Sequence, residues 1–517
     1  MADLQWWETA VIYQIYPRSF QDTNGDGIGD LLGIKSRLEY ISNLGVDAIW
    51  ISPFFKSPQK DFGYDVSDYY KINPEYGLLA DFDDLLKRAH ELGLKVIVDI
   101  VPAHCSDQHP WFLESRKSRD NEKADWFHWL DPLPDGNVPT NWLSFFGGAA
   151  WTWEPRRQQY YLHNFLSSQP NLNHANPIVR KALVDVIRFW FDRGVDGFRL
   201  DAVHTINGDT PPFKNNPVNS DFVLGSLPID QQPFFRQLHD CAQLNQPAIQ
   251  KFIEELRSVT DSYKGNRFLM GEVDGDNDNA LEVSKTFTAP GRLHATYNFD
   301  LLESGGLNVQ QIKDVISKAI DIFNGTGSIV FAFSNHDVPR VATRQLESLG
   351  LKPEDGDAMQ LLLLKLQACL IGSNCIYQGE ELGFEDVSDI PVEKLQDPWG
   401  IEFAPTFLGR DTCRTPMVWS STESNGGFST ANKTWLPISN DHLKRAGLDQ
   451  ARRSGSIYSQ LADFLRWRKN QPAIISANNM TKPTGGPKQI VFERKTDKQT
   501  LRCIFDFEQL IAEFEEI

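Results

Sequence analysis

Eight short apolar runs, separated by amphipathic segments, constrain the fold more than any other feature of this sequence. They are rich in Val, Ile and Phe and cover 11–15, 48–52, 96–101, 197–203, 268–273, 295–299, 329–333 and 375–378. Between them lie helical patterns such as 83–93 and 179–193, and Gly93 and Gly194 can stop these two helices. Strands that alternate with helices predict the α/β class and a parallel (β/α)8 TIM barrel.

Two connections are too long to be simple barrel loops. Residues 105–174, after the third run, are rich in Trp, Pro, Asp and Gly, and we expect an inserted domain there. We expect the barrel at 1–104 and 175–470, with a second insertion at about 379–455 after the eighth run, and a C-terminal β-sheet domain at 471–517. Within that last domain, 508–517 is expected to be helical or frayed.

The fourth run ends in a charged pair. Arg199 and Asp201 are two residues apart, so on a strand their side chains share a face. An adjacent guanidinium lowers the pKa of a carboxyl group, and we therefore expect Asp201 to titrate low and stay ionised. A fixed carboxylate at the mouth of a barrel strand suits a glycosidase nucleophile, although a structural ion pair would explain this segment equally well.

Polar side chains also follow the other predicted strands. Asp61 and Tyr64 follow the second run, His104 the third, Glu272 lies in the fifth, and His336 and Asp337 follow the seventh. In a barrel these strand ends meet at one rim, so Asp201 and Glu272 are expected to face each other. Retaining glycoside hydrolysis needs two such carboxyl groups, and Asp337 could grip sugar hydroxyls. The alternative is that these acids only anchor loops or bind a metal. This alternative explains any single acid well, but it explains less well why the whole set follows the strand ends.

A loop after the first run is rich in oxygen ligands. Asp22, Asn24, Asp26 and Asp30 alternate with other residues, Gly27 takes the sixth position, and Ile28 can offer its carbonyl. This matches nine positions of a hard-cation loop, but Gly33 replaces the Glu of the twelfth, so a calcium hand is not expected. We expect a structural Ca²⁺ or Mg²⁺ ion. The alternative is a solvated turn rich in Asp and Asn.

Composition limits the partners. The chain has 517 residues and a net charge of −18, which argues against nucleic acid and anionic membrane surfaces. Its six cysteines form no CxxC pair, so we expect them to be reduced and mostly buried. The N-terminal segment has no signal-peptide pattern, and no apolar run is long enough to span a membrane. The interpretation is a cytoplasmic monomer or homodimer that acts on a small molecule.

Taken together, these motifs resemble glycoside hydrolase family 13, the α-amylase family, in its α-glucosidase and oligo-1,6-glucosidase branch. The resemblance covers nearly the whole length. It rests on the opening segment 7–20, the strand-four motif, Gly271–Glu272, the motif 335–337 and the motif 414–417. It implies Asp201 as nucleophile, Glu272 as general acid and base, and Asp337 as transition-state stabiliser. Around the terminal glucose it implies Asp61, Tyr64, His104, Phe146, Phe165, Gln169, Arg199, His336 and Arg410.

The sequence departs from the family in two places. Ala103 stands where the family usually has the Asn that helps to bind a calcium in the inserted domain, and Phe62 stands where many relatives have Asn. In this branch the residue after the nucleophile tends to be Val in α-1,6 enzymes and Ala or Thr in α-1,4 enzymes. Ala202 therefore favours α-1,4 substrates such as maltose, with α-1,3 and α-1,2 bonds as alternatives.

The resemblance also implies transglucosylation, because a covalent glucosyl intermediate can be intercepted by any acceptor alcohol. Three other readings stay open. They are an oligo-1,6-glucosidase, a sucrose- or trehalose-converting isomerase, and a catalytically dead transporter heavy chain. The last would lack the carboxylates and carry a membrane span, whereas this chain has all three acids.

Overall fold

The structure is a computed structural model, and it describes residues 4–220, 238–239, 242–275, 280–302, 305–323, 327–476 and 479–517. Eight parallel strands form a closed barrel in the order β1-β13-β12-β11-β10-β9-β5-β2. Their bounds are β1 (Val11–Ile15), β2 (Ala48–Ile51), β5 (Lys95–Ile100), β9 (Gly197–Leu200), β10 (Phe268–Val273), β11 (Ala295–Asn298), β12 (Ile329–Ala332) and β13 (Ser373–Tyr377). The predicted (β/α)8 barrel is therefore confirmed, and each strand lies where an apolar run predicts one.

Helices follow the barrel strands, as the alternation predicts. The longer ones are α1 (Leu31–Leu44), α2 (Leu79–Glu91), α4 (Pro177–Asp192), α5 (Ile249–Asp261), α6 (Ala280–Phe287), α7 (Val309–Ile322), α8 (Val341–Leu349), α9 (Gly356–Cys369) and α13 (Ile457–Arg468). Asp30 caps α1 by accepting from Gly33 N, and left-handed Gly45 ends it. Such local signals explain why periodicity alone locates these helices.

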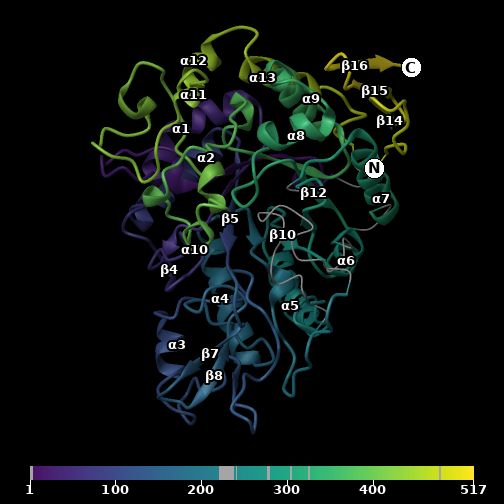
Figure 1. Ribbon diagram of the computed structural model, residues 1–517. Coiled ribbons are helices and arrows are strands. Elements are labelled where there is room, and N and C mark those ends of the chain that lie inside the picture. The colour runs from purple at the N-terminus through teal and green to yellow at the C-terminus, as the bar shows by residue number, and fades with distance from the viewer. Residues whose placement is uncertain are drawn as a thin grey trace. The chain divides into compact units, whose positions relative to one another are not determined.

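Smaller elements fill the long connections. They are β3 (Phe55–Lys56), β4 (Asp68–Ile72), α3 (Pro110–Ser115), β6 (Trp129–Leu130), β7 (Trp151–Glu154), β8 (Gln159–Leu162), α10 (Pro398–Phe403), α11 (Asn440–Leu443) and α12 (Gly447–Arg452). Strands β6, β8 and β7 form a three-stranded antiparallel sheet within the range expected for the inserted domain. Figure 1 shows β7 and β8 beside α3.

The chain divides into two compact units, each of which is described by itself. The first comprises 1–52, 75–97 and 294–517, and the second comprises 53–74 and 98–293. Both are discontinuous in sequence.

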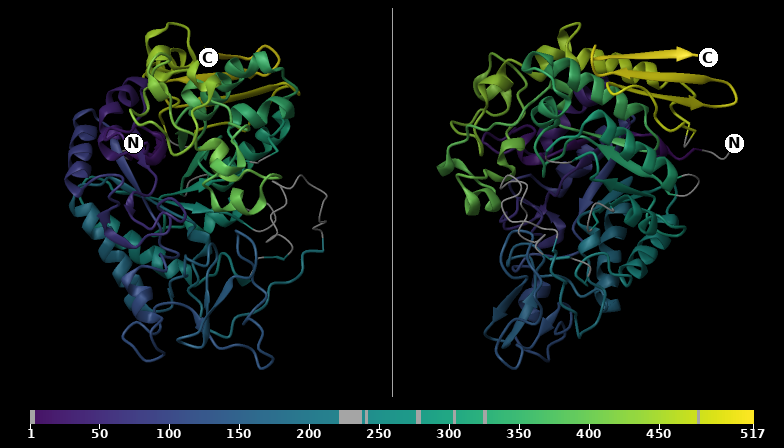
Figure 2. Two further views of the ribbon diagram at one scale, coloured as in Figure 1. Left: turned by 60° about the vertical axis from the view of Figure 1, so that its left-hand side comes forward. Right: turned by 45° about the vertical axis from the view of Figure 1, so that its right-hand side comes forward.

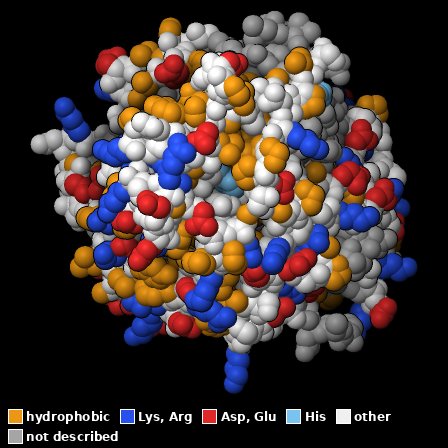
Figure 3. Space-filling model, turned by 90° about the horizontal axis from the view of Figure 1, so that it is seen from below, with side chains coloured by type: hydrophobic (Ala, Val, Ile, Leu, Met, Phe, Trp, Pro, Cys, Tyr) orange, Lys and Arg blue, Asp and Glu red, His pale blue; other side chains and the backbone are white. Residues whose placement is uncertain are grey.

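On the face shown in Figure 3, Lys and Arg side chains are interspersed among Asp and Glu side chains.

The C-terminal sheet corrects one expectation. Strands β14 (Gln489–Lys495), β15 (Thr500–Asp506) and β16 (Ile511–Glu516) form an antiparallel sheet, so 508–517 is neither helical nor frayed. Burial alternates along β16, and Phe514 packs on Phe464 and Trp467 of α13. A two-residue period of this kind is too short to stand out in sequence. Figure 2 shows the sheet in yellow beside green helices.

Two further predictions concern cysteines and membrane spans. Cys105, Cys369, Cys375, Cys413 and Cys503 are free and buried, as expected, whereas Cys241 lies outside the described residues. Across the described ranges, no helix has both the length and the apolar character needed to cross a bilayer.

Candidate active site

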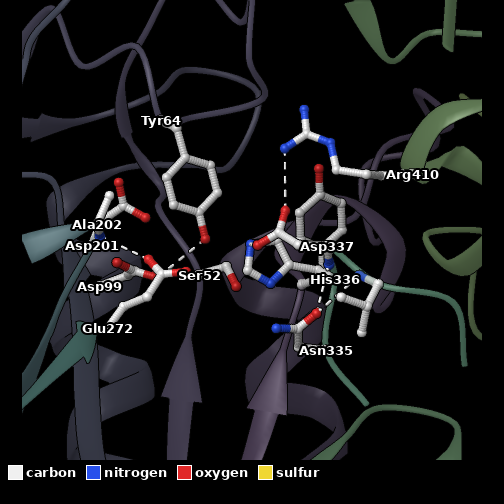
Figure 4. A network of polar contacts seen from close by, with 12 residues as sticks. Ser52, Tyr64, Asp99, Asp201, Ala202, Glu272, Asn335, His336, Asp337 and Arg410 are labelled. Carbon is white, nitrogen blue, oxygen red and sulfur yellow. Dashed lines mark hydrogen bonds and ion pairs between the residues drawn. The ribbon is translucent and has the colours of Figure 1, made fainter. Parts of the chain in front are cut away.

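A buried arginine organises an acidic cluster in the second unit. Arg199, on β9, is 1% exposed, and its Nη1 donates to Asp201 Oδ1 at 2.6 Å and to Asp99 Oδ1 at 3.0 Å. Its Nη2 lies 2.6 Å from Glu272 Oε2, and the Tyr64 hydroxyl donates to Asp99 Oδ2 at 3.2 Å. Three carboxylates thus share one guanidinium group. Figure 4 shows the Tyr64 hydroxyl directed toward the carboxylates of this cluster.

The backbone around Asp201 differs from the sequence prediction. Strand β9 ends at Leu200 instead of continuing to 203, and η3 (Val203–Thr205) follows as a 3-10 helix. Between them Ala202 has a left-handed backbone with φ of 41°, an uncommon conformation for a residue with a side chain. Its N–H donates to Glu272 Oε2 at 2.7 Å. Arg199 therefore does reach Asp201, but through a turn and not along a continuous strand face.

Packing against neighbouring side chains fixes the position of Glu272. Glu272 lies on β10 directly after Gly271, and a Cβ atom at Gly271 would come within 2.5 Å of Leu293 Cδ1 and 2.9 Å of Val203 Cγ1. A side chain at this position would therefore force the Leu293 and Val203 side chains to shift. This glycine therefore lets β10 pack against Val203 and present Glu272 to Arg199 and to the Ala202 N–H.

The expectation that Asp201 titrates low is wrong. Burial raises the pKa of Asp201 well above its usual value; Arg199 acts to lower the pKa, while Glu272 and Asp99 raise it further. Sequence proximity reveals one Arg beside one Asp, whereas the fold adds two more carboxylates around the same cation.

A second polar group in this unit surrounds Gln169. Gln169 Nε2 donates to Asp61 Oδ2 at 2.9 Å and lies 3.2 Å from His104 Nε2. His104 Nε2 also lies 3.1 Å from the Tyr64 carbonyl oxygen. Burial lowers the pKa of His104 to about 4, so this imidazole is neutral at neutral pH. The structure thus brings together four residues that the sequence places up to 108 positions apart.

Aromatic rings lie beside this group. The Phe165 ring is 5.1 Å from the His104 ring and 6.0 Å from the Phe146 ring, centroid to centroid. Phe145, which the sequence analysis leaves out, stacks on Phe165 at 5.2 Å. Aromatic faces of this kind can pack on the apolar face of a sugar ring.

The first unit holds a separate cluster around Asp337. Asp337 Oδ1 lies 3.1 Å from Arg410 Nη1 and 2.8 Å from Arg414 Nη2, and its Oδ2 lies 3.2 Å from His336 Nε2. Arg410 is held in turn by Asp397, 2.7 Å from its Nη2. Burial acts to raise the pKa of Asp397, but pairing with Arg410 prevails and lowers it. Figure 4 shows Arg410 above Asp337, with His336 beside it.

Sequence reasoning assigned no site role to several members of these clusters. Asp99 interrupts the apolar run of β5, and an acid inside a buried strand is a usable signal. Asp397 gives no such signal, because it lies in a long connection. Arg414 enters the sequence analysis only through its motif, with no contact assigned to it.

The predicted metal loop is held by hydrogen bonds. Asp22 accepts from Asn24 N, Gly25 N, Gly27 N and the Ser429 hydroxyl, and Asp30 accepts from Thr23 and Gly33 N. The donor set of carboxylate, amide and carbonyl oxygens suits a hard cation, but these N–H and O–H groups already occupy most lone pairs of Asp22 and Asp30. The described residues contain no cluster of three or more acidic, His or Cys side chains arranged around a metal position.

Comparison with known proteins adds the family. A family model described as alpha amylase, catalytic domain, matches residues 14–477. A "Probable alpha-glucosidase" of Rhizobium meliloti (strain 1021) is 46% identical, over 98% of this chain and 90% of its own length. An "Oligo-1,6-glucosidase" of Heyndrickxia coagulans is 34% identical, over 99% of this chain and 94% of its own. The crystal structure of an alpha-glucosyl transfer enzyme, XgtA, superposes with a TM-score of 0.91 at 45% identity and covers 98% of this chain and 92% of its own.

Proposed function

The chain belongs to the α-amylase family, in its α-glucosidase and oligo-1,6-glucosidase branch, and we propose that it is a retaining, exo-acting α-glucosidase. Its substrates are short oligosaccharides with a terminal, non-reducing α-glucosyl unit. The observation that carries this proposal is the buried guanidinium of Arg199, which bonds Asp201 and Glu272 at 2.6 Å each and so holds two carboxyl groups side by side.

The proposed first step forms a covalent intermediate. An Asp201 oxygen attacks the anomeric carbon, the bond from that carbon to the glycosidic oxygen breaks, and Glu272 gives its proton to the leaving oxygen. A β-glucosyl ester on Asp201 results. Arg199 stays bonded to both carboxyl groups, so it offsets the negative charge that develops on Glu272 when the proton leaves.

In the second step Glu272, now a carboxylate, takes a proton from water or from an acceptor alcohol. That oxygen attacks the anomeric carbon, the ester bond to Asp201 breaks, and the α-configuration is restored. Hydrolysis and glucosyl transfer thus differ only in the acceptor. The likeness to XgtA, an alpha-glucosyl transfer enzyme, supports the transfer branch.

The remaining predicted residues receive binding roles. Asp61, Gln169 and His104 offer a carboxylate, an amide and a neutral imidazole to sugar hydroxyls, with Tyr64, Phe146 and Phe165 as aromatic neighbours. Asp337, with His336 and Arg410, is assigned to transition-state stabilisation. It follows β12 as Asp201 follows β9, and barrels of this kind place catalytic groups at the carboxyl ends of their strands.

The proposed linkage rests on Ala202. A small side chain beside the nucleophile leaves room for the leaving sugar of an α-1,4 bond, so maltose is favoured over isomaltose. The chief alternative is an oligo-1,6-glucosidase, which the relative from Heyndrickxia coagulans supports. A sucrose- or trehalose-converting isomerase is a further alternative.

A proton NMR time course on maltose, nigerose, kojibiose, isomaltose and sucrose tests these proposals. We expect α-glucose to appear first, and from maltose faster than from isomaltose. β-Glucose as the first product would overturn the retaining mechanism, whereas faster release from isomaltose would overturn only the linkage. Conversion of sucrose without release of glucose would favour the isomerase. Ala202→Val should move the preference toward isomaltose.

Three further proposals come from the sequence. They are a structural Ca²⁺ or Mg²⁺ ion on Asp22, Asn24, Asp26, Ile28 and Asp30, a cytoplasmic location, and a monomeric or homodimeric state. No step of the proposed mechanism passes through the cation.

A further inference from the structure

Gln14 contacts a buried histidine of the Asp337 cluster. It lies on β1 and is completely buried, as is His336. Gln14 Nε2 is 2.8 Å from His336 Nδ1 and 3.4 Å from Ser52 Oγ. All these residues, together with Asp337, belong to the first unit. Gln14 plays no part in the function proposed above.

The other nitrogen of the ring determines where the proton is. His336 Nε2 lies 3.2 Å from Asp337 Oδ2. An ionised carboxylate can only accept, so Nε2 must carry a hydrogen. A neutral imidazole has one N–H, which leaves Nδ1 as an acceptor, and the Gln14 amide must then donate to it.

The opposite amide orientation is less favourable. Suppose that the Gln14 side-chain oxygen faced Nδ1 of a neutral His336 ring protonated at Nε2. A lone pair on that oxygen would then point at the lone pair on Nδ1, and the two would repel each other. The amide NH₂ would then occupy the present position of the Gln14 oxygen. At that position no hydrogen-bond partner is present among the described residues. Two buried N–H groups would then lack an acceptor, at a greater cost than one unpaired oxygen.

An imidazolium would avoid that clash, but the local charges oppose it. Asp337 already bonds Arg410 and Arg414, so an imidazolium beside Asp337 would lie near two further cations. The ring itself lies between Tyr16, stacked at 5.7 Å, and Trp50, edge-on at 6.2 Å. A third cation in this buried environment would carry a desolvation cost and would be repelled by the two guanidinium groups.

We propose that Gln14 is a positioning residue that holds His336 as the neutral Nε2–H tautomer, so that His336 donates to Asp337. Asp337 then receives three donors, from His336, Arg410 and Arg414, which fix its orientation as an anion. The consequence for catalysis rests on the function proposed for Asp337, but the tautomer itself does not.

Nitrogen NMR of ¹⁵N-histidine-labelled protein at neutral pH reads the tautomer directly. Signals of His336 are assigned by their loss in His336→Gln. We expect Nδ1 at the unprotonated position and Nε2 at the protonated position. A protonated Nδ1 in the wild-type protein would overturn the proposal.

Gln14→Glu is the sharpest variant, because it replaces the amide donor by an acceptor of the same shape. We expect Nδ1 to become protonated and kcat to fall by about tenfold or more, with a smaller change in KM. Gln14→Met, which neither donates nor accepts there, gives a second test if Gln14→Glu does not fold. It should shift the His336 signals and lower kcat. Unchanged His336 signals in both variants would contradict the proposal.

A matched control separates loss of a buried amide from loss of this contact. Gln450 is also buried and donates to the carbonyl oxygens of Leu382 and Arg445. Gln450→Met should lower Tm and leave the His336 signals and kcat unchanged. If the proposed function is wrong, the NMR result still stands, whereas kcat of Glu272→Gln on glucosides would be unaltered.

Discussion

The two acidic clusters differ in how many cations serve how many carboxylates. In the second unit, one guanidinium, Arg199, bonds Asp99, Asp201 and Glu272. In the first unit, Arg410 and Arg414 bond Asp337, and Arg410 also bonds Asp397. In the first arrangement one cation bonds three carboxylates, and in the second two cations bond two carboxylates.

This difference accompanies opposite pKa shifts of one carboxyl group in each cluster. Burial raises the pKa of Asp201, and the neighbouring Glu272 and Asp99 raise it further against the opposing effect of Arg199. Asp397 is also buried, but pairing with Arg410 prevails and lowers its pKa. The comparison teaches that two buried carboxyl groups can have opposite pKa shifts, depending on how the surrounding carboxylates and cations are arranged.

The largest expected effect comes from the second-unit cluster. Glu272→Gln and Asp201→Asn should each lower kcat on maltose by about 10⁴-fold or more, because each removes a group that reacts covalently or transfers a proton. Tm of Asp201→Asn should be unchanged or higher, since a carboxylate leaves a cluster in which one cation bonds three carboxylates. Assays with maltose and thermal melts check this. Retained turnover in either variant would refute the assigned roles.

Removal of the Asp337 charge should affect stability in the opposite direction. Asp337→Asn leaves Arg410 and Arg414 without a shared anion, so we expect a loss of about 1–3 kcal/mol in the free energy of unfolding. The kcat on maltose should fall by about 10³-fold. Urea denaturation and initial rates measure both. Equal or higher stability would show that the two clusters do not differ as described.

The pH dependence of stability should have opposite signs in the two clusters. The folded pKa of Asp201 is raised, so its contribution to stability is lost as pH rises through that pKa. The Tm of Asp201→Asn minus the Tm of the wild type should therefore increase as pH rises. The folded pKa of Asp397 is lowered, so its contribution is present above the unfolded value of about 3.9 and is lost in acid.

Asp397→Asn should accordingly be less stable than the wild type at neutral pH, with the deficit shrinking in acid. Tm measured across the acidic and neutral range for the three proteins checks both signs. The same sign for both variants would mean that the charge ratio does not control these carboxyl groups.

The smallest effect is expected at the loop 22–30, which belongs to neither cluster. Ca²⁺ should raise Tm by a few degrees, and Asp22→Asn should abolish that increment while leaving kcat nearly unchanged. Melts with Ca²⁺, Mg²⁺ and a chelator test this. Identical melts would show that the hydrogen bonds of Asp22 and Asp30 hold the loop without a cation.

Local patterns were sufficient to predict the fold. Each barrel strand is a short apolar run, and its position depends on neighbours in sequence, so periodicity located all eight. The prediction was wrong where long-range contacts decide the backbone. The strand predicted to run to 203 ends at Leu200, where the Ala202 N–H donates to Glu272. The segment predicted to be helical or frayed forms a strand at 511–516, where Phe514 packs on α13.

The sequence by itself determined which carboxylates follow which strands, because strand ends are set by local pattern. Only the tertiary structure decided how those carboxylates share their charge. Asp99 reaches Arg199 from 100 residues away, Arg414 reaches Asp337 from 77, and Gln14 reaches His336 from 322. Electrostatic energy depends on distance in space, and the folded barrel, not the order of the chain, sets those distances.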